Sequence, residues 1–125
     1  MNNKDLKQIC DNLIDTFFIA GDRSIELRKI GLKKEIKPDN TPVTNGDLEV
    51  NDILTKKITN ITPDIPIISE ESDSNKSNKN LSKFWLIDPI DGTYDYVNNK
   101  EEFTLNAALI INKEPELGII YAPAK

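Results

Sequence analysis

Four consecutive apolar residues, Phe84 to Ile87, lead directly into Asp88-Pro89-Ile90-Asp91-Gly92-Thr93. A short, fully apolar run bounded by turn signals is typical of a buried strand, so this segment predicts a strand that other elements must cover. Proline fixes one backbone angle and lacks an N–H donor, and Gly92 permits a bend that other residues resist. We therefore expect a turn directly after the strand, with the carboxylates of Asp88 and Asp91 pointing at the same spot.

The rest of the sequence predicts helices and strands around this segment. Apolar residues recur at spacings of three and four over 5–28 and over 45–60, which predicts two amphipathic helices. Gly21 is expected to loosen the first helix, because a mid-helix glycine costs about 1 kcal/mol relative to alanine. A turn is expected at 113–115 and a polar surface loop at 72–82. Three further segments have the composition of strands: residues 65–68, 103–111 and 116–121. The expected fold class is α+β, with two helices packed on a mostly antiparallel sheet.

The composition limits the chemistry that this chain can perform. It contains no histidine, and Cys10 is its one cysteine, which excludes Ser-His-Asp and Cys-His catalysis, His-metal and Cys-rich zinc sites, and an intrachain disulfide. Catalysis therefore has to use carboxylates, hydroxyls, lysines and bound ions. The net charge of −5 and the lack of a basic stripe argue against a nucleic-acid polymer as partner.

Nothing in the sequence indicates a membrane or a secretory route. No stretch of about 18 apolar residues is present, so no transmembrane segment is expected. Residues 1–7 are polar and lack the apolar centre of a signal peptide. The expected location is the cytoplasm.

Asp88 and Asp91 suggest a magnesium site. Mg²⁺ is a hard cation that is commonly held by one or two carboxylates together with phosphate oxygens. A short helix beginning at Thr93 would aim backbone amides at an anion next to that metal. The structural alternative is that Asp-Gly forms an ordinary turn, or that an aspartate caps the following helix. An EF-hand loop fits poorly, because the twelfth position counted from Asp88 is Asn99 instead of glutamate.

Glu70 and Glu71 follow the strand expected at 65–68. Adjacent acidic residues at a strand end are usually solvated. If the two short apolar strands are neighbours, however, their ends bring Glu70 to Asp88 and Asp91. Three converging carboxylates without a metal repel one another and raise their pKa values, whereas with divalent ions they form the beginning of a two-metal phosphoryl-transfer site.

Thr44 and Asp47 have the spacing of a helix capping box, with aspartate in place of the preferred glutamate or glutamine. This explains both residues as a helix cap. The functional alternative places Asp47 behind the metal site, where it accepts a hydrogen bond from Thr93 or from a metal-bound water.

In order and spacing, three segments resemble the motifs of the inositol monophosphatase superfamily. The motifs D-x-S/T-P-V-T-x-A-D, G/S-E-E-S and W-L-x-D-P-x-D-G-T correspond here to Asp39–Asp47, Ser69–Ser72 and Trp85–Thr93. Within the superfamily the sequence is most similar to the CysQ-type 3′(2′),5′-bisphosphate nucleotidases, through Glu102–Asn106 and Tyr121–Pro123. The resemblance implies that residues 1–125 form the metal-binding N-terminal half of a layered αβαβα sugar-phosphatase fold.

The resemblance also implies a role for each site residue. It implies two or three Mg²⁺ ions, with four ligands in this chain: the carboxylates of Glu70, Asp88 and Asp91 and the carbonyl of Ile90. The residues implied to contact the substrate phosphate are Glu70, Ile90, Asp91, Gly92 and Thr93. The residues implied in catalysis by a metal-activated water are Glu70, Asp91, Thr93 and Asp47. The implied reaction is hydrolysis of adenosine 3′,5′-bisphosphate to AMP and phosphate, with inositol monophosphate as the alternative substrate.

Some features depart from the superfamily pattern. Gly46 replaces the usual alanine, which is expected to be a small change, and Tyr94-Asp95-Tyr96 replaces the common Lys-Glu-Phe, so a basic residue is missing. The later W-D-x-A-A-G motif, which supplies a further metal-binding aspartate, is absent. The site is therefore expected to be incomplete: either a complementing C-terminal chain supplies the remaining ligand, or this chain is an inactive remnant or interaction module. A homodimer is also expected as a possible assembly, because the sheet would have an exposed edge. Haloacid dehalogenase chemistry is excluded because Pro89 occupies the position of its aspartate nucleophile.

Overall fold

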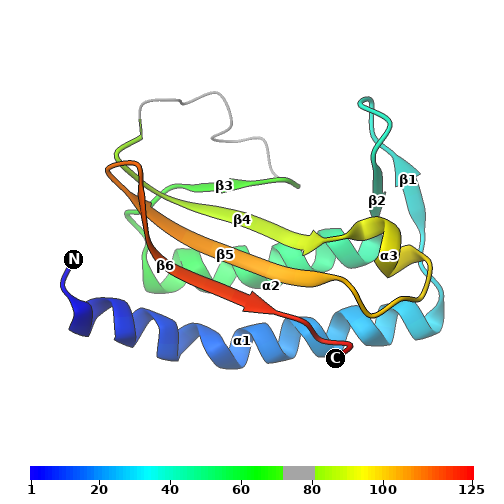
Figure 1. Ribbon diagram of the computed structural model, residues 1–125, viewed down its shortest axis with the longest axis horizontal. Coiled ribbons are helices and arrows are strands. Elements are labelled where there is room, and N and C mark those ends of the chain that lie inside the picture. Colours follow the sequence, from blue (N-terminus) through cyan, green and yellow to red (C-terminus); the bar gives the residue numbers. More distant parts are fainter. Residues whose placement is uncertain (72–80) are drawn as a thin grey trace.

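The computed structural model describes residues 1–71 and 81–125, and the polar loop expected at 72–82 lies almost entirely outside these ranges. Two long helices lie side by side and cover one face of a four-stranded sheet, while a separate two-stranded hairpin lies at one end of the molecule (Figure 1). This arrangement confirms the expected α+β class. The elements are, in chain order, α1 (Asn3–Ile30), β1 (Lys34–Ile36), β2 (Pro42–Thr44), α2 (Asn45–Ile61), β3 (Ile67–Ser69), β4 (Lys83–Asp91), α3 (Thr93–Val97), β5 (Thr104–Ile111) and β6 (Glu114–Tyr121).

The first helix, α1, is continuous and extends slightly beyond the predicted range at both ends. The side chain of Asn2 accepts a hydrogen bond from the Asp5 N–H at 2.9 Å, which caps the helix, and Gly31 ends it with a positive φ of 118°. The expectation that Gly21 loosens α1 is wrong. A Cβ atom at Gly21 would lie 2.5 Å from Tyr121 Cε2, so glycine is required there because the end of β6 packs directly on the helix backbone.

The second helix, α2, begins with the predicted capping box. Thr44 Oγ1 accepts from the Asp47 N–H at 3.2 Å, and Asp47 Oδ2 accepts from the Thr44 N–H at 2.9 Å. The expectation that glycine in place of alanine at position 46 is a small change is also wrong. A Cβ atom at Gly46 would lie 2.7 Å from Tyr96 Cε2, which is closer than two carbon atoms can approach without displacement.

The main sheet has the strand order β3-β4-β5-β6 and is mostly antiparallel, as predicted. Only β3 and β4 run parallel; Ile67 is opposite Trp85 and Ser69 is opposite Ile87. This pairing confirms that the two short apolar strands before the acidic segments are neighbours. Their carboxyl ends therefore lie at the same edge of the sheet.

The hairpin between β5 and β6 differs from the prediction. A turn over 113–115 is wrong: the loop consists of Asn112 and Lys113, whose φ angles are 52° and 68°, and Pro115 already pairs with Ile110 in the ladder. Two consecutive positive φ angles are typical of a two-residue type I′ turn, whose twist suits antiparallel strands. Pro115 is tolerated because β6 is an edge strand, where a missing N–H donor breaks no second ladder.

The core lies between the helices and the sheet. Trp85, Phe17 and Leu54 are among the fully buried side chains that fill this layer. The opposite face of the sheet is open in the described part of the chain, where Leu86 is 47% and Ile120 is 77% exposed. No helix among the described residues is both long enough and apolar enough to span a membrane.

The one tryptophan provides a test of this core. Trp85 Nε1 donates to Thr62 Oγ1 at 3.0 Å, and both residues are buried. Thr62→Val should lower the free energy of unfolding by about 1–3 kcal/mol, because it leaves the buried indole N–H without an acceptor. Thr62→Ser keeps the hydroxyl and should lose less than about 1 kcal/mol. Urea unfolding followed by Trp85 fluorescence measures both values, and equal losses would show that this bond does not stabilise the core.

Candidate functional site

A β-bulge brings the two aspartates of β4 to one face of the sheet. Asp88 pairs with Asn106 and Asp91 pairs with Thr104, so three steps along β4 match two steps along β5. Because Asn106 and Thr104 are two residues apart on β5, they share a face, and the aspartates opposite them share it too. The predicted turn directly after Ile87 is therefore wrong: the strand continues to Asp91.

The reason for this difference is local. Pro89 has no N–H to donate, and it lies within the bulge, where the ladder is interrupted and no donor is required. The bend comes afterwards at Gly92, whose backbone is left-handed with φ 86° and ψ 42°. A Cβ atom there would lie 2.8 Å from the Glu102 carbonyl oxygen, so only glycine fits.

Glu70 joins this group through the parallel pair. Its N–H donates to the Ile87 carbonyl at 3.2 Å, which extends the contact between β3 and β4 by one residue and places Glu70 next to Asp88. These residues border a hollow of about 330 Å³, a volume in the range of about 300–1,000 Å³ that is usual for small-molecule sites. The lining residues are Lys37, Asp39, Thr41, Pro42, Glu70, Glu71, Asp88, Gly92, Thr93 and Tyr94.

The electrostatics show how closely the acidic groups approach one another. The pKa of Asp88 rises from its ordinary value of 3.8 to about 6, first because the group is partly buried, and then because Asp91 and Glu70 repel its negative form. Asp47 and Glu71 add smaller repulsions. The pKa of Asp88 is therefore raised first by burial and second by the repulsion that was predicted for converging carboxylates, while Asp91 does not itself line the hollow.

Asp47 lies directly behind the hollow and is fully buried. Its Oδ2 accepts from the N–H and the hydroxyl of Thr44, and its Oδ1 accepts from the Thr93 hydroxyl at 2.9 Å. The helix cap and the bond to Thr93 are therefore present together, since they use different oxygen atoms of one carboxylate. The Thr93 hydroxyl also lies 3.3 Å from the Ile90 carbonyl oxygen, while the Ile90 side chain is buried in the core.

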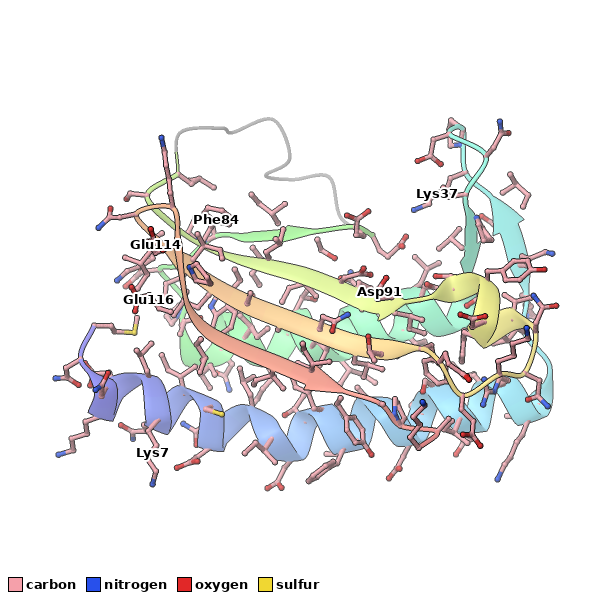
Figure 2. The ribbon with its side chains drawn as sticks, viewed as in Figure 1. Lys7, Lys37, Phe84, Asp91, Glu114 and Glu116 are labelled. Atoms are coloured by element: carbon pink, nitrogen blue, oxygen red, sulfur yellow. The ribbon has the colours of Figure 1, made fainter. Side chains whose placement is uncertain are left out.

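Two residues of the hollow, Lys37 and Glu71, had no role assigned from the sequence, where Glu71 was noted only as the neighbour of Glu70. The side chain of Glu71 is only 9% exposed, and its Oε1 lies 3.6 Å from Lys37 Nζ. Figure 2 shows Lys37 extending from the loop between β1 and β2 toward the end of β3. Burial raises the pKa of Glu71, and the Lys37 ammonium opposes that rise. The prolines and Asp39-Asn40 between Lys37 and Thr44 are the sequence signal for the hairpin that brings Lys37 back over the site.

The donor groups have the chemistry that magnesium prefers. The acidic residues and the Ile90 carbonyl offer only oxygen ligands, which suit Mg²⁺ and exclude a preference for softer metals. As placed in residues 1–71 and 81–125, no three acidic side chains come close enough to enclose an ion. Glu70 and Asp91 are exposed, so close packing does not stop their carboxylates from turning toward Asp88. The residues therefore fit Mg²⁺ by the type of donor that they offer.

The raised pKa of Asp88 predicts a pH effect on the metal-free chain. Between pH 3.8 and about 6 the folded chain binds more protons at Asp88 than the unfolded chain, so this group makes stability fall as pH rises through that window. Asp88→Asn should remove the contribution of this group to the fall in the free energy of unfolding. We expect that contribution to be on the order of 1 kcal/mol, because solvent screens a partly exposed group. Thermal unfolding in EDTA from pH 4 to 7 measures it, with the exposed Asp64→Asn as control. An unchanged pH slope in Asp88→Asn would contradict the crowding of charge at this site.

Comparison with known proteins agrees with this geometry. Residues 5–125 match the inositol monophosphatase family. The 3′(2′),5′-bisphosphate nucleotidase CysQ of Buchnera aphidicola is 48% identical over 88 residues, which are 70% of this chain and 33% of that protein. The solved IMPase of Thermotoga maritima is 29% identical with a TM-score of 0.81, and the match covers 92% of this chain and 44% of the Thermotoga protein. A solved IMPase/NADP phosphatase complexed with Mg²⁺ and phosphate is 26% identical with a TM-score of 0.79, and the match covers 95% of this chain and 45% of that protein.

The three proteins named above are all longer than the chain itself. The chain spans about a third of the length of the curated relatives that it matches and under half of the solved structures. The family match begins in the first turn of α1 and continues through β6, so it includes every residue of the site described above. This chain belongs to the inositol monophosphatase family.

Proposed function

We propose that this chain carries the metal-binding part of a magnesium-dependent phosphatase that hydrolyses adenosine 3′,5′-bisphosphate to AMP and phosphate. The main support is the position of Asp88 in β4, beside Glu70 at the end of β3 and on the same face as Asp91, together with the Thr93–Asp47 hydrogen bond. The choice of substrate is supported by the similarity to CysQ proteins, whose name states 3′(2′),5′-bisphosphate nucleotidase. Inositol monophosphate is the alternative substrate.

The metal ligands in this proposal are the carboxylates of Glu70, Asp88 and Asp91 and the carbonyl of Ile90. Together they would hold two or three Mg²⁺ ions. When bound, Mg²⁺ would lower the pKa of the attacking water and offset the negative charge of the phosphate. The repulsion that raises the pKa of Asp88 supports this assignment, because a cation at the same place would relieve it.

Thr93 and Asp47 would act together as the proton acceptor. The hydroxyl of Thr93 has one proton, which it donates toward Asp47 Oδ1, so its lone pairs remain able to accept a proton from water. The Asp47 carboxylate is fixed by its bonds to Thr44 and cannot rotate without breaking the helix cap. Asp47 therefore fixes the direction in which the Thr93 hydroxyl points, and Glu70 and Asp91 would orient the water from the other side.

Gly92 and Thr93 would contact the phosphate through their backbone. Gly92 borders the hollow and lacks a side chain that could block an approaching anion. Tyr94, at the position where a basic residue was expected from the resemblance, is 70% exposed at the rim of the hollow. The positive charge needed to balance a phosphate would therefore come mainly from the bound ions, since Lys37 is already paired with Glu71.

The open face of the sheet is where we propose that a second polypeptide packs, as a second copy of this chain or as a chain that supplies the C-terminal half of the fold. The support is that Leu86 and Ile120 lie exposed on this face. Of these two partners, only a chain with the C-terminal half would supply the ligands that the W-D-x-A-A-G motif carries elsewhere in the superfamily.

Metal binding by the isolated chain is the first test. Mg²⁺ should raise the melting temperature of the chain at pH 7.5, because an ion bound only to the folded state stabilises it by mass action. Asp91→Asn should remove most of this increase, while Asp64→Asn, an exposed acid before β3, should keep it. Loss of the increase in both variants, or in neither, would refute the assignment of the metal site.

Turnover is the second test. The isolated chain with Mg²⁺ should release phosphate from adenosine 3′,5′-bisphosphate only slowly, because a two-ion site that lacks one ligand holds an ion poorly. Asp91→Asn should abolish the remaining rate, and inositol monophosphate should react more slowly. A phosphate-release assay with both substrates measures this. Equal rates for the chain and Asp91→Asn would count against the proposed site, and faster release from inositol monophosphate would reverse the substrate assignment.

A further inference from the structure

Helix α3, which carries Thr93, depends on other parts of the chain for its position. It has only five residues, and its N-cap Gly92 provides no side-chain hydrogen bond. An isolated helix of this length is unstable in water, because nucleation is unfavourable and too few bonds repay it. Its one buried residue is Tyr96, three positions after Thr93. Tyr96 is therefore the main anchor that holds α3 in place.

Tyr96 attaches α3 to both long helices. Its hydroxyl donates to the Ser24 carbonyl oxygen of α1 at 2.7 Å, and the residue is fully buried. Its ring packs on Gly46 of α2 so closely that there is no space for a Cβ atom. The Phe103 ring also contacts Tyr96, with centroids 4.8 Å apart, and the Arg28 guanidinium lies 5.5 Å from the ring centroid. The ring is thus enclosed by contacts from several elements.

The two partners of the Thr93–Asp47 hydrogen bond lie close in sequence to the two residues of the Tyr96–Gly46 contact. Thr93 lies on the same short helix as Tyr96, and Asp47 follows Gly46 directly in α2. A change in the spacing between Gly46 and Tyr96 therefore changes the spacing between Asp47 and Thr93. A hydrogen bond of 2.9 Å weakens steeply when its geometry is disturbed, so small displacements here matter.

We propose that Tyr96 is a positioning residue: packed on Gly46 and bonded to the Ser24 carbonyl, it sets the distance between Thr93 and Asp47, and residues 46 and 96 act as one unit. The catalytic meaning of this unit rests on the proposed function, in which Thr93 accepts a proton. A larger residue at 46 would push the tyrosine ring and α3 away from Asp47. Loss of the hydroxyl at 96 would release the ring from α1, so that the ring could shift away from a methyl group at 46.

The test uses the full chain, without metal or substrate, and four variants: Tyr96→Phe, Gly46→Ala, the double variant, and Tyr94→Phe. The last makes the same chemical change on the same helix at a residue that is 70% exposed. Hydrogen exchange and NMR chemical shifts report α3 through the amide of residue 96, which donates to the Gly92 carbonyl at 3.0 Å, and through Thr93. Amides of β5 report the global stability.

Tyr96→Phe should speed exchange at residue 96 by about fivefold or more, consistent with the loss of one buried hydrogen bond, and should shift the Thr93 resonances. The β5 amides should change far less, and Tyr94→Phe should change neither region. Gly46→Ala should have a larger effect than Tyr96→Phe. In the double variant, the effect of Gly46→Ala should be much smaller than in the single variant, because the released ring can retreat.

Three results would overturn the proposal. The first is an unchanged Thr93 in Tyr96→Phe, and the second is equal acceleration in α3 and β5, which would indicate a purely global role. The third is an effect of Gly46→Ala that stays undiminished in the Tyr96→Phe background. If Gly46→Ala fails to fold, the comparison of Tyr96→Phe with Tyr94→Phe still tests whether Tyr96 positions Thr93. A failure to bind Mg²⁺ would refute the proposed function, whereas the measurements on Tyr96 need no metal and would keep their meaning.

Discussion

The candidate site depends on one buried carboxylate. Asp47 is inaccessible to solvent, and burying a charge is strongly unfavourable unless hydrogen bonds compensate for it. Three donors do so here: the N–H and hydroxyl of Thr44 and the hydroxyl of Thr93. Because these donors come from the end of β2 and the start of α3, satisfying Asp47 also fixes where both elements lie. Helix capping and the orientation of a proposed catalytic hydroxyl are thus consequences of the same requirement.

In front of Asp47, the chain places like charges close together, which opposes stability. Asp88 is raised to a pKa of about 6 by partial burial and by its acidic neighbours, so the folded chain is under electrostatic stress at neutral pH. The surrounding structure maintains this arrangement through the parallel pairing of β3 with β4 and the bulge before Asp91. Ion pairing between Lys37 and Glu71 offsets one of these charges. In the proposed function a divalent cation would offset this repulsion, which otherwise makes the metal-free site less stable.

Much of this could be predicted from residue patterns. The spacing of Leu6, Leu13 and Phe17 predicted α1, the apolar runs predicted β3 and β4, and the Thr44–Asp47 spacing predicted the capping box. The failures share a cause. Gly21 and Gly46 were judged by helix propensity and by side-chain size, yet their role is set by Tyr121 and Tyr96, which are distant in sequence. Pro115 was placed in a turn because nothing local shows that β6 lies at the edge of the sheet.

The sequence alone limited which chemistry is possible, because the absence of histidine and the single cysteine leave carboxylates, hydroxyls, lysines and bound ions as the reactive groups. It also determined the helices and most strands, since these follow from local periodicity and capping. Only the tertiary structure decided that Asp88 and Asp91 share a face, that Glu71 is buried against Lys37, and that Tyr96 is enclosed by α1 and α2. Each of these three features depends on strand register or on contacts between segments far apart in the chain. The spacing of neighbouring residues determines neither the register nor the distant contacts.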